Sequence, residues 1–151
     1  MGKVMFYHLT RSSVDETTRM LIGKCLEAGW RVALRATDGE RLAWLDEKLW
    51  LGPEDGFLPH GIAGGAHDAA QPVLLTLGAA GNGADAVIAV DQAEVAPGEA
   101  AALERICILF DGMDGAAVEH ARGQWRAFKK VGAMAEYWSQ ESGSWEMKAA
   151  T

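Results

Sequence analysis

The segment 116–130 combines cationic and aromatic side chains at helical spacing. Arg122, Arg126 and Lys129 lie four and three residues apart, so on a helix they form one stripe. A neighbouring apolar stripe holds Val118, Ala121, Trp125 and Phe128. Arginine can bind a carboxylate through two parallel hydrogen bonds, and an apolar surface beside it can bury a ring. The pattern favours a ligand with an acid and an apolar anchor, and the alternative is an amphipathic helix whose cations are solvated.

The charge balance restricts the kind of partner. The 151 residues carry 14 Lys and Arg against 21 Asp and Glu, a net charge of −7. Broad binding of nucleic acid requires a positive surface, so little direct contact with nucleic acid is expected. Between His120 and Gly132, however, there are four cations and no acid. A local basic patch on an acidic protein indicates a defined anionic partner.

The sequence offers no recognisable phosphate site or nucleophile. The turn at residues 10–13 contains no glycine, so it matches neither the dinucleotide fingerprint nor the phosphate loop. Gly78, Gly81 and Gly83 lie between two expected strands and favour a hairpin or connecting turn over a phosphate cradle. There is no Gly-x-Ser-x-Gly elbow. We therefore predict neither a catalytic set nor a cofactor.

Two groups of acidic or histidine residues are candidates for a metal or catalytic site. His60, His67 and Asp68 lie in a glycine-rich stretch, but their spacing does not require a metal. Asp111 and Asp114 could form a carboxylate pair, but they suit a turn, with Asp114 close to the next helix start. We predict no metal site.

The expected elements alternate between strand and helix. Strands are expected at 3–9, 31–36, 72–77, 86–90 and 105–110. Helices are expected at 14–28, 39–50, 116–130 and, shorter, 133–140. Residues 52–71 are expected to form a loop. Alternation of this kind predicts a single-domain, three-layer α/β fold, with a mostly parallel sheet between flanking helices. The domain is expected to span residues 1–140, followed by a polar tail at 141–151.

Local signals fix several helix ends, and the remaining features indicate a cytoplasmic protein. Ser13 and Glu16 have capping-box spacing, Gly29 suits a left-handed helix end, and Asp38 is expected to cap the second helix. Cys25 and Cys107 are too few for a disulfide framework and are expected to be small core residues. No run has the length of a membrane span or the form of a signal peptide, so we expect a cytoplasmic location.

Six short motifs occur in a fixed order along residues 6 to about 138. They are Phe6-Tyr7-His8-Leu9, Trp30-Arg31-Val32, Leu45-Asp46-Glu47-Lys48-Leu49-Trp50, Phe57-Leu58-Pro59-His60, Pro72-Val73-Leu74-Leu75 and Ala121-Arg122-Gly123-Gln124-Trp125-Arg126-Ala127-Phe128. Taken together they resemble the chi subunit family of bacterial DNA polymerase III. The ordered set is far more specific than any single motif.

The resemblance implies a fold like that of nucleotide-binding proteins without nucleotide chemistry. It also implies a non-catalytic adaptor that links the clamp loader to single-stranded-DNA-binding protein. That protein's C-terminal tail is acidic and ends in an aromatic residue. The family further implies the psi subunit as a second partner and a link to a repair helicase. The alternative is a small nucleotide-binding or hydrolytic enzyme of similar topology.

Site residues follow from motif position. By the resemblance, Arg122, Trp125 and Arg126 contact the tail peptide, and Trp125 stands where the family also uses tyrosine. Trp50 and Phe57 are expected to contribute from the region after the second helix, on the same side of the molecule, although each could instead pack in the core. Lys129 is added from helical spacing alone.

Overall fold

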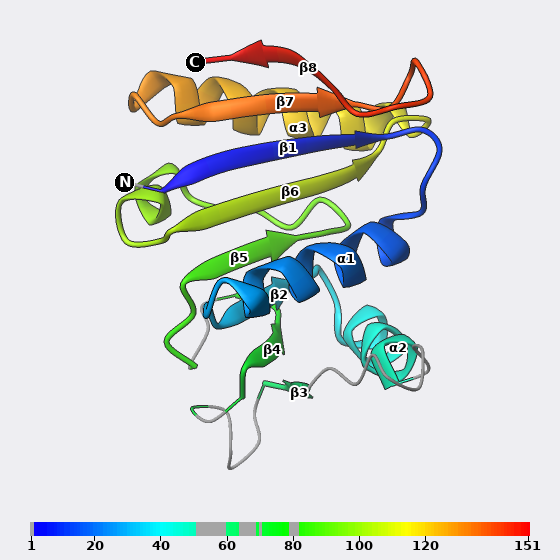
Figure 1. The fold of residues 1–151 in the computed structure, drawn as a ribbon, viewed down its shortest axis with the longest axis vertical. Coiled ribbons are helices and arrows are strands. Elements are labelled where there is room, and N and C mark those ends of the chain that lie inside the picture. Colours follow the sequence, from blue (N-terminus) through cyan, green and yellow to red (C-terminus); the bar gives the residue numbers. More distant parts are fainter. Residues whose placement is uncertain (1, 51–59, 64–68, 70, 79–81) are drawn as a thin grey trace.

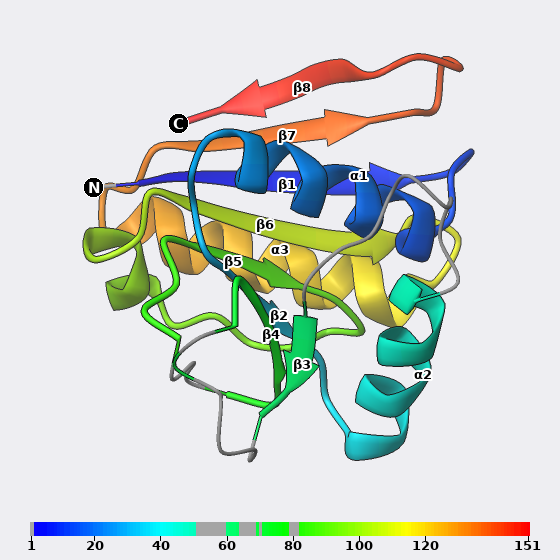
Figure 2. The ribbon, with the colours of Figure 1, turned by 60° about the horizontal axis from the view of Figure 1, so that its bottom comes forward.

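The chain forms one eight-stranded sheet with helices on both faces (Figures 1 and 2). This computed structural model describes residues 2–50, 60–63, 69, 71–78 and 82–151. Its elements are β1 (Lys3–Leu9), α1 (Val14–Glu27), β2 (Val32–Arg35), α2 (Gly39–Trp50), β3 (His60–Ile62), β4 (Val73–Thr76), β5 (Ala86–Ala89), the 3-10 helix η2 (Pro97–Ala101), β6 (Arg105–Asp111), α3 (Gly115–Lys130), β7 (Ala135–Ser139) and β8 (Glu146–Ala150). The strand order is β3-β4-β2-β5-β6-β1-β7-β8, and β7 with β8 is the antiparallel pair.

Alternation along the strands divides the core into two layers. In β1, Met5 and Leu9 pack against α1 and α2, whereas Val4 and Phe6 face α3 and η2. Both faces of the central strands are buried, as in parallel sheets generally. The predicted three-layer, mostly parallel α/β fold is confirmed. Within the described residues, no helix has the length and apolar character that crossing a bilayer requires.

The predicted helix ends and core cysteines are confirmed. Ser13 Oγ accepts a hydrogen bond from the Glu16 amide at 3.1 Å, and Gly29 has a φ of +81° after α1. Asp38 Oδ1 accepts a hydrogen bond from a backbone amide in the first turn of α2. Cys25 and Cys107 are free and buried, and burial raises the pKa of both thiols.

The predicted helix at 133–140 is wrong. Gly132, with a φ of +76°, ends α3, and the chain returns as β7, parallel to β1 with Ala135 opposite Val4. Residues 141–151 were expected to be a polar tail, but Glu146–Ala150 forms β8 and pairs with β7. The side chains of β8 are exposed, as expected for a polar segment, but its backbone pairs with β7 and extends the sheet.

The region between α2 and β5 adds one departure and decides one open alternative. His60–Ile62, within the predicted loop at 52–71, forms β3 and pairs with β4. Of the two alternatives predicted for the connection after β4, a hairpin or a connecting turn, the connecting turn is found, because β4 and β5 both run parallel to β2, which lies between them. Asn82 holds this connection to the sheet by donating hydrogen bonds to the backbone oxygens of Val32 and Gln71.

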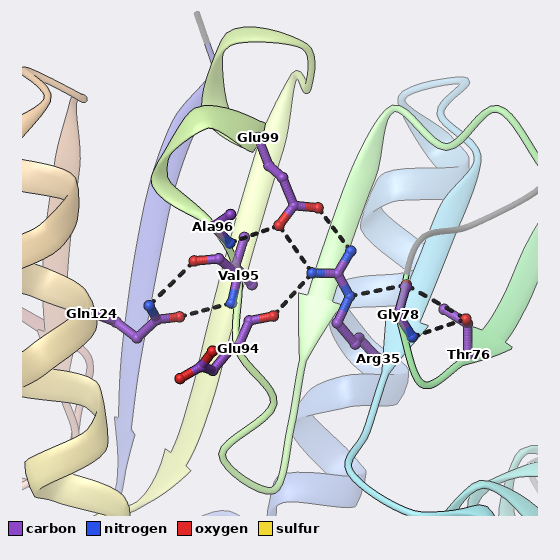
Figure 3. Close-up of polar contacts among 8 residues, drawn as sticks. All are labelled: Arg35, Thr76, Gly78, Glu94, Val95, Ala96, Glu99 and Gln124. Atoms are coloured by element: carbon purple, nitrogen blue, oxygen red, sulfur yellow. Dashed lines mark hydrogen bonds and ion pairs between the residues drawn. The ribbon is translucent and has the colours of Figure 1, made fainter.

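Arg35 ties three separate segments together at the end of β2 (Figure 3). Its guanidinium donates two hydrogen bonds to the Glu99 carboxylate, at 3.1 and 2.8 Å. It also donates to the backbone oxygens of Glu94 and Gly78. Arg35 is only 6% exposed, so this pairing satisfies a buried charge. The network fixes the segment 94–99, on which α3 packs.

Glu99→Gln should destabilise the protein, and the effect should depend on pH. Breaking one side of a buried ion pair costs about 3–5 kcal/mol, and the partial exposure of Glu99 reduces this to about 2 kcal/mol. The hydrogen bonds from Arg35 lower the pKa of Glu99, so the folded protein binds fewer protons than the unfolded chain. The unmodified protein therefore has its full extra unfolding free energy over the variant at pH values above the ordinary pKa of glutamic acid. This difference is lost as the pH falls through the lowered pKa of Glu99.

Denaturant unfolding of both proteins between pH 7 and pH 3 measures this difference. Glu94→Gln is the matched control, because Glu94 meets Arg35 through its backbone oxygen. Equal stability of the Glu99→Gln variant and the parent at pH 7 would show that the pair contributes nothing.

Candidate peptide-binding site

Helix α3 presents its apolar face to the sheet and its cations to solvent. Asp114 caps the helix, accepting hydrogen bonds from the Ala116 and Ala117 amides. Ala121 and Phe128 are buried against the sheet. Val118 and Trp125, the other two residues of the predicted apolar stripe, are partly buried and pack against the same cluster. The basic stripe of Arg122, Arg126 and Lys129 is exposed, as the helical spacing predicted.

Gln124 fixes the rotation of α3 about its axis. Its side-chain oxygen accepts a hydrogen bond from the Val95 amide at 2.9 Å, and its side-chain nitrogen donates to the Val95 oxygen at 3.2 Å (Figure 3). Val95 is fully buried and lies in the segment held by Arg35 and Glu99. Because Gln124 points at the protein, Arg122 and Arg126, two residues to either side, point away from it.

A recess of about 380 Å³ lies beside the two arginines. It is lined by Arg122, Trp125, Arg126, Tyr137 and Ala149. The Trp125 ring packs edge-on against Phe6 at 5.3 Å and against Tyr137 at 6.0 Å. The recess therefore has one wall from α3 and a second wall from β7 and β8. Guanidinium groups next to aromatic rings can hold a carboxylate and an apolar side chain together.

The two arginines differ in their partners. Arg122 Nη1 lies 2.8 Å from Glu119 Oε1, with the two side chains 60% and 66% exposed. Exposed ion pairs of this kind contribute little stability, so Arg122 can exchange Glu119 for another carboxylate. For Arg126, no ion pair is found within the described parts of the chain. The recess therefore has a free cation and a weakly engaged one.

Tyr137 joins the recess to the core. Its ring stacks on Phe6 at 6.4 Å, and its hydroxyl lies 2.7 Å from Nδ1 of His8. Burial and Glu141 raise the pKa of Tyr137, whereas Arg122 lowers it. The positive charge of Arg122 therefore acts on Tyr137, which lines the recess. Tyr137 therefore stays a neutral hydrogen-bonding group at physiological pH.

Sequence reasoning missed Tyr137 and Ala149 because it took 133–140 for a helix. The segment Ala135–Ser139, AEYWS, is short and rich in aromatic residues, which is also typical of a buried strand. That composition was the available signal for Tyr137. No sequence signal identified Ala149, whose position depends on the pairing of β8 with β7.

The structure does not bring every predicted residue to this recess. Lys129 is exposed in the last turn of α3 but does not line the recess. Trp50 is the last residue of α2, and α2 lies on the opposite face of the sheet from α3 (Figure 1). Phe57 lies outside the described residues. The side chain of Trp50 and the whole of Phe57 lie outside what the structure describes, so a contribution of either residue stays a prediction.

The turn after β1, where nucleotide-binding folds hold a phosphate, is occupied by Gln140. Its side-chain oxygen accepts hydrogen bonds from the amides of Thr10, Arg11 and Ser12, at 3.1 to 3.3 Å. Its side-chain nitrogen donates to Ser12 Oγ, and Gln140 is 6% exposed. A buried amide thus satisfies the backbone donors that would otherwise cradle an anion.

The acidic and histidine groups weighed earlier take ordinary structural roles where they are described. Asp111 accepts a hydrogen bond from the Met113 amide, and Asp114 caps α3. His67 and Asp68 lie outside the described residues, and the side chain of His60 is not described. Across the described ranges, no group of three or more His, Cys, Asp or Glu residues could hold a metal ion.

Comparison with known proteins identifies one family. The family model described as DNA polymerase III chi subunit, HolC, matches residues 1–136. The match includes the whole of α3 and ends within β7. No curated protein matches the chain.

Gln124→Leu should destabilise the fold by about 1–3 kcal/mol, because it leaves the buried amide and oxygen of Val95 without partners. Denaturant unfolding measures the change. Lys130→Leu, at the exposed end of α3, is the control and should change the unfolding free energy by less than about 0.5 kcal/mol. If the two variants proved equally stable, Gln124 would not be the residue that fixes α3.

Proposed function

We propose that this chain, which belongs to the DNA polymerase III chi subunit family, binds the acidic C-terminal tail of single-stranded-DNA-binding protein. Membership of the family makes the chain an accessory subunit of DNA polymerase III. In this proposal the subunit is a cytoplasmic adaptor without a catalytic site. It links the tail to the clamp loader during DNA replication.

The recess beside α3 is the observation that carries this proposal. Two exposed guanidinium groups, Arg122 and Arg126, stand beside the partly buried ring of Trp125. An acidic peptide that ends in an aromatic residue offers the complementary groups, a terminal carboxylate and a ring. The ring of Tyr137, which packs edge to face against Trp125, gives the ligand's ring a second contact surface.

A binding sequence follows from this arrangement. Long-range attraction between the cations and the acidic tail speeds encounter, with Lys129 contributing from the last turn of α3. The terminal ring then enters the recess, and an arginine holds the carboxylate. Ordering a flexible tail offsets part of the gain, so we expect a Kd of about 1 µM, or about −8 kcal/mol. Several tails on an oligomeric partner raise the effective affinity.

The alternative, a small nucleotide-binding or hydrolytic enzyme, has weaker support. Gln140 fills the position at the β1–α1 turn where such a protein would bind phosphate. A nucleotide would have to displace a side chain that makes four hydrogen bonds. In the proposal, Trp50 and Phe57 are secondary contacts at most. The psi subunit and a repair helicase are the further partners that family membership suggests.

Arg122→Glu should abolish binding of the tail peptide without changing the fold. The reversed charge repels the carboxylate, so we expect a loss of at least about 100-fold in affinity. Arg122→Lys keeps the charge but loses the bidentate geometry, and we expect about a tenfold loss. Calorimetric titration with the acidic tail peptide at two salt concentrations measures both, and binding of the parent should weaken with salt.

A scrambled peptide with the same charge, but without the terminal aromatic residue, is the control. Normal binding of the true peptide by the Arg122→Glu variant would show that the peptide binds elsewhere. Tight binding in a parallel nucleotide panel would favour the enzyme alternative.

Glu119→Gln should strengthen tail binding about two- to threefold. The substitution removes the carboxylate that pairs with Arg122, so the guanidinium no longer exchanges one acid for another. The same titration measures it, with Glu104→Gln as a charge-matched control on a different part of the chain. Unchanged affinity after Glu119→Gln would mean that Arg122 is already free in solution.

A further inference from the structure

The β7–β8 end of the sheet lacks a helix on the face that carries α1. Helix α1 packs on β2, β5 and β6, and Met5 and Leu9 of β1 are buried in the same cluster, whereas Figure 1 shows no helix in front of β7 and β8. Parallel sheets are normally covered on both faces, because their strands carry apolar side chains on both. Among the described elements, none supplies the missing layer beside α1.

The uncovered strands present aromatic and methionine side chains. Tyr7 and Trp145 pack edge to face at 5.4 Å, and Trp138 lies beside them. Met147 is opposite Trp138 in the pairing of β7 with β8, so it lies on the same face, and it is 52% exposed. On the α1 side, Met20 is 41% exposed. Tyr7, Trp138, Trp145 and Met20 line a recess of about 420 Å³ between α1 and this end of the sheet.

The two charged residues that line this recess, Lys24 and Arg105, are both cations. The guanidinium of Arg105 lies over the ring of Trp30 at 5.5 Å, and its buried Nε has no hydrogen-bond partner. The nearby acid, Glu136, is already engaged by Lys3 and by the indole nitrogen of Trp138.

Among the described residues neither cation forms an ion pair, so both can pair with a carboxylate; the charge of Arg105 already contributes to the lowered pKa of Glu136. On a chain with a net charge of −7, this is a second local basic surface, and it lies on the opposite face from α3.

We propose that this surface seats an amphipathic helix of a partner protein, with its apolar stripe on Tyr7, Trp138 and Trp145 and carboxylates beside Lys24 and Arg105. A helix is the occupant that the layer lacks, and it would lie alongside α1. Strand β1 has seven residues, or about 23 Å, and a helix of about 15 residues has that length. This proposal does not depend on the tail peptide, whose recess is on the other face.

Three fluorescein-labelled helical peptides of 15 residues provide the test, with binding followed by anisotropy. The first has a leucine stripe flanked by glutamates, the second has the same stripe flanked by lysines, and the third has the glutamates with serines in the stripe. The full-length chain should bind the first at least about tenfold more tightly than either of the others. Equal binding of the first two would overturn the proposal.

Two variants locate the site. Lys24 lies on the surface of α1, and Arg105 lies at the start of β6. Lys24→Gln and Arg105→Gln should each reduce the preference for the glutamate peptide over the lysine peptide about threefold or more. Lys130→Gln, which removes the same charge from α3, should leave it unchanged. Both recess variants should still bind the tail peptide normally, so this result is separable from the proposed function. An unchanged preference in Lys24→Gln and Arg105→Gln together would place the helix elsewhere and overturn the proposal.

Sedimentation of the chain alone tests the competing occupant, a second copy of itself. We expect a monomer at the concentrations used for the titration. A dimer that Trp138→Ser dissociates would assign this surface to self-association and overturn the partner helix.

Discussion

The edge-to-face contact between Phe6 and Trp125 connects the middle of the sheet to the recess beside α3. Phe6 is fully buried, and the same ring also contacts Phe128 and Tyr137. One residue of β1 therefore sets the positions of both aromatic walls. A recess held in this way loses little freedom when a ligand binds, which lowers the entropic cost of capturing a flexible peptide.

A second constraint acts on the polar side of α3. Gln124 holds the helix to Val95, and Val95 belongs to the segment that Arg35 fixes through Glu99 and Glu94. The exposed arginines are thus oriented by residues that do not touch any ligand. This division is physically sensible, because a guanidinium that must exchange partners cannot also be a structural anchor.

Features encoded locally could be predicted from the sequence. The caps at Ser13 and Asp38, the left-handed Gly29 and the stripes of α3 depend on residues within a few positions of one another. Periodicity could not distinguish the strand β7 from a helix, because a run of five residues carries no reliable period, and only its aromatic composition favoured a strand. What makes it a strand is its pairing with β1, at the far end of the chain.

The candidate site shows the same division. Arg122, Trp125 and Arg126 lie on one helix, so spacing alone places them together. A prediction of whether Trp50 lies near α3 requires knowledge of which face of the sheet α2 covers. Leu42 and Leu45 pack with α1 on the face opposite α3, and this depends on the crossover of the chain rather than on local pattern.

The antiparallel strand β8 has a consequence for any comparison of this recess with other members of the family. The match to the family model covers residues 1–136, whereas Tyr137 and Ala149 form the second wall of the recess. The matched range thus contains Arg122, Trp125 and Arg126 but not the residues that face them. A comparison of ligand contacts within the matched range alone would therefore leave out one wall of the recess, because the end of β7 and β8 supply it.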